Sequence, residues 1–229
     1  MELKEVILKR SSIRAFRSDP VPRAEIEKII HSGICAPSKG NSQIWEFVII
    51  TGEKKDELAE ILLDLLKTDF IPAMQLGETD DDNEPGKAYK KAKTRSDLNK
   101  TEISAILSKL DISFDQFMLE GTFTFFNAPA VILVFADTAF AKDLPHVLSI
   151  GAAVENMLLT VSDIGLGACW IGGVWRYTNR IRQVLDIPKN KILLSSIALG
   201  YPDDKSPITE YKSKRDDINE FATWIGFDN

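Results

Sequence analysis

The sequence predicts a layered fold of the α/β or α+β class, in which helices cover a β-sheet. Short apolar runs alternate along the chain with segments whose apolar residues recur at helical spacing. Residues 130–136 form the clearest strand, a continuous apolar run after Pro129 that is typical of a strand covered on both faces. The helical pattern from Val147 to Val161 predicts the best-buried helix. With 229 residues, 44% of them hydrophobic, the chain is long enough for one full core, so we predict a single domain over residues 1–229.

The remaining elements follow from the same two periodicities. Prolines at positions 20 and 22 interrupt the chain between the first two helices and set up the second. The tail from Ile218 to Ile225 is strongly apolar at helical spacing, so we expect a helix there that a second subunit covers. Further helices are predicted near residues 2–10, 23–35, 58–66 and 181–185, and further strands near 45–51, 168–171 and 192–200.

The middle of the chain, at about residues 68–120, is predicted to be an inserted variable region. Residues 77–100 carry an acidic run followed by many lysines and almost no large apolar side chain. Such charge runs are usually solvated, so an exposed, mobile insertion is favoured over a ligand-binding lid. A short helix is predicted after it, around residues 103–110.

Charge and composition exclude several classes of function. The 28 Lys and Arg residues face 34 Asp and Glu residues, so no overall positive field attracts nucleic acid or an anionic membrane. No apolar run approaches the roughly 18 residues of a membrane span. Cys35 and Cys169 are predicted to be small buried hydrophobic residues, and His31 and His146 to be structural. Two cysteines and two histidines form neither a metal cage nor a disulfide framework, and we expect a cytoplasmic protein without a metal site.

Three segments contain residues suited to binding a ligand. Arg10-Ser11-Ser12-Ile13-Arg14 places two guanidinium groups and two hydroxyls where they can bind phosphate, although a basic helix end explains the same pattern. Residues 36–43 gather amide and hydroxyl side chains in a turn, which is also typical of an ordinary loop. Trp170-Ile171-Gly172-Gly173 ends a strand with two residues that lack side chains, which suits either a flat ligand or a simple turn.

Together and in this order, the three segments resemble the nitroreductase-like flavoprotein family. The family's opening Arg-Ser-X-Arg pattern with a following phenylalanine appears in residues 10–16, and its Ala-Pro-Ser-X-X-Asn-X-Gln-X-Trp-X-Phe pattern is intact from Ala36 to Phe47. Residues 127–129, 155–159 with 165–172, and 198–202 also match. The resemblance covers about residues 1–70 and 120–220. It implies an α+β fold with a mixed, mainly antiparallel sheet flanked by helices, in a homodimer.

The resemblance also implies how FMN is bound. Arg10 would lie near the phosphate and Arg14 near the pyrimidine edge of the flavin, where a fixed cation stabilises the reduced ring. Lys214 and Arg215 would complete the phosphate clamp, although the spacing leaves open which of Lys212, Lys214 and Arg215 touch phosphate. Gly172 and Gly173 would approach the flavin N5. The full set of implied cofactor-binding residues is Arg10, Ser11, Ser12, Arg14, Pro37, Ser38, Asn41, Gln43, Ile171, Gly172, Gly173, Lys214 and Arg215.

The implied reaction is ping-pong hydride transfer at a flavin that lies at the dimer interface. NADH or NADPH reduces FMN and leaves, and a small electrophilic acceptor such as a nitroaromatic or quinone then takes the electrons. No side chain is singled out as catalytic, because the flavin carries the chemistry. Residues 37–43 would reach the flavin from the other subunit, and the inserted region would set substrate choice. Two alternatives remain open: another redox reaction on the same flavin fold, such as dehalogenation, flavin fragmentation or dehydrogenation, and a non-catalytic dimeric binding protein.

Overall fold

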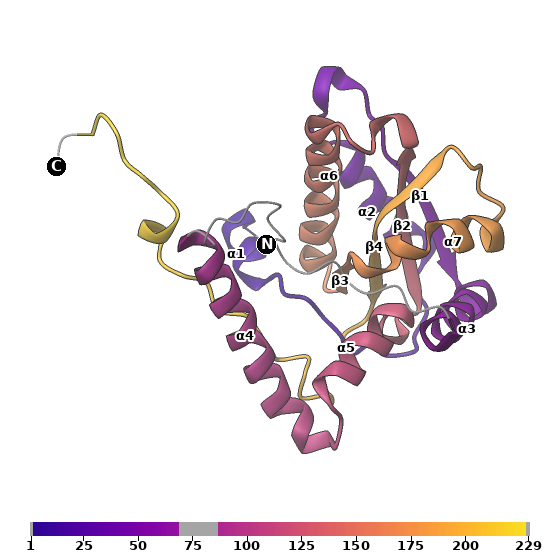
Figure 1. Cartoon of the computed structure of the whole chain (residues 1–229), viewed down its shortest axis with the longest axis horizontal. Helices are drawn as coiled ribbons and strands as arrows, with labels where there is room; N and C mark the ends of the chain where they lie inside the picture. Colours follow the sequence, from indigo (N-terminus) through magenta and orange to yellow (C-terminus); the bar gives the residue numbers. More distant parts are fainter. Residues whose placement is uncertain (1, 69–86, 228–229) are drawn as a thin grey trace.

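The computed structural model describes residues 2–68 and 87–227, which form a four-stranded sheet between layers of helices (Figure 1). The strands β1 (Glu46–Thr51), β2 (Ala130–Asp137), β3 (Gly167–Ile171) and β4 (Lys191–Gly200) lie in the order β1-β2-β4-β3. All three neighbouring pairs are antiparallel. The α+β class and the central position of the apolar run at 130–136 are therefore confirmed.

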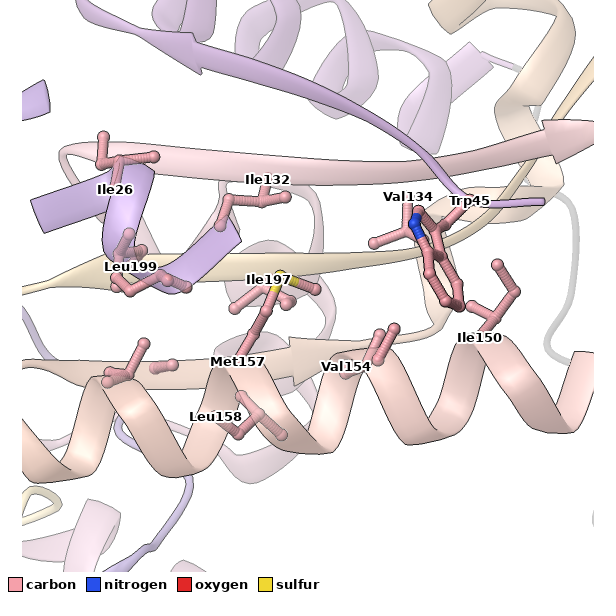
Figure 2. Packing of buried hydrophobic residues seen from close by; sticks show 14 of the residues in the cluster. Ile26, Trp45, Ile132, Val134, Ile150, Val154, Met157, Leu158, Ile197 and Leu199 are labelled. Atoms are coloured by element: carbon pink, nitrogen blue, oxygen red, sulfur yellow. The ribbon is translucent and has the colours of Figure 1, made fainter. Parts of the chain in front are cut away.

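Side chains of β2 alternate between two hydrophobic clusters, one on each face of the sheet. On one face, Ile132 and Val134 pack against α2 (Arg23–Ile34) and α6 (Leu144–Asp163), as Figure 2 shows. On the other face, Val131, Leu133 and Phe135 pack against α3 (Gly52–Thr68), α5 (Phe114–Phe123) and α7 (Thr178–Leu185). A strand buried on both faces needs an apolar residue at every position, which explains the unbroken run.

Helix α6 is the core helix that the sequence predicts. Ala153, Val154 and Met157 are fully buried beneath the sheet. Among the described residues it is the one helix long and apolar enough to span a membrane by length and composition, and here its apolar side packs on α2 and the strands. The buried aliphatic side chains of α6 are therefore part of the hydrophobic core.

The inserted region is more regular than the sequence indicates. Helix α4 runs from Lys87 to Leu107, so the expected solvated segment at residues 87–100 is helical and the expected short helix at 103–110 is its end. The part of the region at 69–86 lies outside the described residues. One face of α4 binds the C-terminal segment: Arg95 pairs with Asp216 at 2.5 Å, and Lys91 pairs with Glu220. Such exposed ion pairs contribute little to stability, and the buried contacts of α4 lie near its end, where Ile103 and Leu107 pack against Ile208. The local sequence reveals neither set of distant partners.

The expected helix at the C-terminal tail is wrong. The tail contains a single 3₁₀ turn, η6 (Ile218–Glu220), which begins where the Asp217 carboxylate accepts a hydrogen bond from the Asn219 backbone N–H at 3.0 Å. Its large apolar side chains are between 59% and 85% exposed, and it extends away from the sheet in Figure 1. A helix this short is marginal unless a surface covers its apolar side chains. Helix α4 contacts Phe221, whose ring centroid lies 4.9 Å from the Arg95 guanidinium, but it leaves this and the other large apolar side chains mostly exposed.

Candidate functional site

The segment that follows helix α1 (Leu3–Lys9) lies along the edge of the sheet. Arg10 caps the helix with an extended backbone, and the chain then joins β3, where the Ile13 backbone N–H donates to the Ala168 carbonyl at 2.9 Å. Ser12 forms a parallel bridge with the same residue. Gly167 permits this close approach, because a Cβ there would lie 2.9 Å from Cγ1 of Ile13.

Alternation along this extended segment separates core side chains from those that face a cavity. Ile13 is buried, so its neighbours Ser12 and Arg14 face the opposite side. That side is a cavity of about 360 Å³. The residues that line it are Ile7, Leu8, Arg10, Ser11, Ser12, Arg14, Asn99, Glu155, Tyr211, Lys212, Ser213 and Arg215.

The cavity carries an excess of positive charge. Arg10, Arg14, Lys212 and Arg215 face it, against one carboxylate, that of Glu155, which lies 3.8 Å from Nε of Arg10. Nε of Arg14 is buried and has no hydrogen-bond partner among the described residues. A buried donor without an acceptor is costly, so this arrangement suits an anionic, hydrogen-bonding ligand.

Arg14 also lies close to strand β3. Burial raises the pKa of the Cys169 thiol, and the positive charge of Arg14 partly opposes that rise. The thiol is therefore protonated at neutral pH and belongs to the core, as expected. Cys35 differs from the expectation: it is exposed because it follows the last residue of α2, with its sulfur 3.9 Å from Nδ1 of His31.

The C-terminal segment brings a second set of polar side chains to the cavity. Tyr211 bonds through its hydroxyl to the Asn99 side chain at 2.8 Å and the Glu102 carboxylate at 3.1 Å, both on α4. Lys214 donates to Glu102 at 2.6 Å, and this bond lowers the pKa of that carboxyl group. Lys214 is thereby directed toward α4, whereas Lys212 and Arg215 line the cavity. Sequence spacing alone does not distinguish these three cations.

Residues 37–43 form a loop that is fixed to helix α6 at a different place. Lys39 donates from its backbone N–H to the Ser149 hydroxyl at 3.2 Å, and from its side chain to Asp143 at 3.0 Å. Inside the loop, the Ser38 hydroxyl accepts from the Gln43 backbone N–H at 3.1 Å. Arg10 contacts the same helix at Glu155, six residues beyond Ser149 and therefore about 9 Å along the axis.

Not all of the residues implied by the resemblance meet in this one chain. Arg10, Ser11, Ser12, Arg14 and Arg215 line the cavity, and the loop residues Pro37, Ser38, Asn41 and Gln43 and the turn residues Ile171, Gly172 and Gly173 are outside its lining. Lys212, one of the three cations that the sequence leaves open as phosphate contacts, lines the cavity. Tyr211 and Asn99 also line it, and the sequence does not predict them as site residues. For Tyr211, the available signal is its position directly before the basic cluster at residues 212–215.

The ion pair between Lys39 and Asp143 joins loop 37–43 to helix α6, and its contribution to stability can be tested by changing the pH. Hydrogen bonds from Lys39 and then His146 lower the pKa of Asp143 below its usual 3.8. A carboxyl group with a lowered folded-state pKa stabilises the fold above the unfolded pKa, and this contribution is lost as pH falls through the folded value. Asp143→Asn is expected to lower stability at neutral pH, and the difference from the wild type is expected to shrink as pH falls below 3.8 and to vanish below the folded-state pKa, as measured by denaturation at several pH values. Asp204→Asn, an exposed change, is the control and should show no such difference.

The fold and the cavity define an α+β protein with a cation-lined cavity at the edge of its sheet. The chain belongs to the nitroreductase family, whose model matches residues 7–201. It is 25% identical over 231 residues to a 4-nitrobenzoate reductase of Nocardioides sp. (strain LMS-CY), an alignment that covers 98% of this chain and 90% of the relative.

Solved structures share this fold over the whole chain. An FMN and NADPH-dependent nitroreductase NfnB from Sphigopyxis sp. strain HMH superposes with a TM-score of 0.83 at 22% identity, covering 99% of this chain and 100% of the other. The FMN-dependent nitroreductase NfnB from Mycobacterium smegmatis, solved in complex with NADPH, gives a TM-score of 0.79 at 23% identity and covers 98% of each chain. At these identities the likeness establishes the fold of the chain.

Proposed function

We propose that the chain is an FMN-dependent oxidoreductase that uses NADH or NADPH to reduce a small electrophilic acceptor, such as a nitroaromatic or a quinone, by a ping-pong mechanism. The observation that carries the proposal is the cation-lined cavity, in which Nε of Arg14 is buried without a partner among the described residues. The FMN and NADPH dependence printed for the NfnB relatives supports the same choice of cofactor and donor.

The residues present fit FMN by charge and by hydrogen-bonding capacity. Arg10, Lys212 and Arg215 provide a group of cations for a phosphate, to which guanidinium groups bind in a forked geometry. The Ser11 and Ser12 hydroxyls add donors that a phosphate or polyol accepts. FMN, when bound, supplies hydride acceptance and donation. We propose Lys212 and Arg215 as the phosphate ligands, because Lys214 is held by Glu102.

Arg14 has a different proposed role from the phosphate ligands. It is fixed between the cavity and β3, where its guanidinium also donates to the Ser12 carbonyl at 3.3 Å. A fixed cation beside the pyrimidine edge of a flavin favours the anionic reduced ring and so raises its reduction potential. Gly172 follows β3 and leaves its backbone open for a flat ring to approach.

We also propose that the enzyme is a cytoplasmic homodimer with the cofactor at its interface. Loop 37–43 lies outside the cavity of its own chain, so a second copy is needed to bring Pro37, Ser38, Asn41 and Gln43 to the flavin. The exposed apolar tail supports the same arrangement, because burying it removes a large apolar surface from water. Sedimentation of the FMN-loaded protein is expected to give twice the mass of one 25.6 kDa chain.

The first experiment is the visible spectrum of the purified protein with added FMN. Bound flavin is expected to bleach on anaerobic addition of NADH or NADPH, and its oxidised spectrum is expected to return when nitrobenzene or a quinone is added. Failure to bind FMN at saturation would contradict the proposal and favour a non-catalytic binding protein. Bleaching without reoxidation by either acceptor would keep the cofactor and favour a different redox reaction.

A further inference from the structure

After β3, the backbone is open to solvent at Gly172 and covered by a neighbouring helix at Gly173. The 3₁₀ turn η5 (Gly173–Tyr177) follows β3 after Gly172. A methyl group added at Gly172 would meet no atom within 4 Å, whereas one added at Gly173 would lie 2.7 Å from Cγ2 of Thr122 on α5. The backbone at Gly172 is therefore accessible to a ligand, and α5 forms a wall beside it.

Arg176 lies against this same wall and has one buried donor without an acceptor among the described residues. Its Nη2 lies 3.6 Å from the position that a methyl group on Gly173 would occupy. Its Nε is buried and has no hydrogen-bond partner in the part of the chain that the structure describes. Burying part of a guanidinium group without an acceptor destabilises a protein, so a purely structural role does not explain the position.

Neighbouring arginines show what a structural role looks like in this part of the fold. Arg182 donates to the Lys189 carbonyl and, at 2.7 Å, to the Lys191 carbonyl, and thereby fixes the turn before β4. Arg180 is exposed and donates to the Gln183 side chain. Arg176 differs from these two because its buried Nε–H has no acceptor among the described residues. A ligand could supply that acceptor.

We propose that Arg176 is a specificity-determining residue that binds an anionic group of a substrate at the open backbone of Gly172. This inference rests on the proposed function, since it places the substrate at the end of β3, the strand that the Ser12–Ala168 bridge ties to the cation-lined cavity. The chemistry is a carboxylate or phosphate that takes the forked donors of a guanidinium. Its source is either a carboxylate on the acceptor or the 2′-phosphate that distinguishes NADPH from NADH.

The test uses the FMN-loaded protein and pairs of substrates that differ in one anionic group. The acceptor pair is 4-nitrobenzoate and nitrobenzene, and the donor pair is NADPH and NADH. Arg176→Gln is expected to lower kcat/KM for one anionic member by about tenfold to a hundredfold, mainly through KM, and to leave its partner unchanged. Arg176→Lys is expected to recover part of the loss, because it keeps the charge without the fork. Arg180→Gln, an exposed change on α7, is the matched control.

The pattern of the loss identifies the source of the anion and decides the proposal. A loss confined to 4-nitrobenzoate assigns Arg176 to the acceptor, and a loss confined to NADPH assigns it to the donor. Binding of benzoate and of benzamide, measured by calorimetry, gives an acceptor readout that does not depend on turnover. Equal losses for the two members of each pair, or no loss in any assay, would overturn the proposal. A wild-type flavin spectrum in Arg176→Gln separates that result from failure of the flavin assignment.

Discussion

Replacement of Arg14 by methionine is expected to weaken FMN binding by about tenfold to a hundredfold, because hydrogen bonds to a charged group contribute about 1.5–3 kcal/mol. Methionine keeps much of the length of the side chain and removes its donors and charge. Nε of Arg14 has no acceptor among the described residues, so the change breaks few contacts in the cofactor-free protein. The affinity is measured by the quenching of flavin fluorescence.

The same variant provides a second readout that a purely structural role would not change. Without the cation, the reduction potential of bound FMN is expected to become more negative, because the reduced ring loses its electrostatic stabilisation. Arg14→Lys is expected to restore part of the potential and less of the affinity. Arg23→Met is the control, since that side chain is 92% exposed and pairs with Glu27 on its own helix. Wild-type affinity and potential in Arg14→Met would remove Arg14 from the flavin site.

The parts of the fold that sequence predicts well are those whose environment is set by their own residues. The run at 130–136 reads as a central strand because burial on both faces requires an apolar side chain at each position. The spacing from Val147 to Val161 predicts α6 for the same reason, since one stripe of the helix faces the core. In both cases the apolar residues that form the sequence pattern are the residues that pack in the core.

The parts that sequence predicts poorly depend on partners far away in the chain. Helix α4 reads as a solvated charge run, because the acidic partners of Lys91 and Arg95 are more than a hundred residues later. The tail reads as a helix because its apolar spacing gives no indication that the contact with α4 leaves its large apolar side chains exposed. A periodic pattern predicts a helix only where something covers the apolar face.

In the candidate site, too, some side chains are predicted by their own motif and others depend on distant partners. Ser12 and Arg14 were identified from their own motif, and alternation about the buried Ile13 directs them to the cavity. Lys212 and Lys214 also lie two residues apart, but Glu102 on α4 holds only Lys214. The side chain of Arg176 carries no signal in the sequence, because its distinguishing feature is a missing partner.

Truncation of Met157 to alanine is expected to destabilise the fold by about 2–5 kcal/mol, through lost burial and the cavity left behind. Met157 is fully buried between α6 and the sheet, beside Val154 and Ile197 in Figure 2. It also packs against Gly33 of α2, where an added Cβ would lie 2.9 Å from Cγ of Met157. The free energy of unfolding is measured by denaturation at one fixed concentration of protein and FMN.

The contact with Gly33 turns this truncation into a test of how α2 and α6 pack. Gly33→Ala alone overpacks the contact at a cost of about 1–3 kcal/mol, offset in part by the better helix propensity of alanine. In the double variant the new methyl group occupies part of the space that Met157 leaves, so the total loss is expected to be smaller than the sum of the single losses. Leu119→Ala, at a side chain that is 40% exposed, is the control and is expected to cost much less than Met157→Ala. Strict additivity of the two changes would show that Gly33 and Met157 do not share the contact on which this packing of α2 against α6 depends.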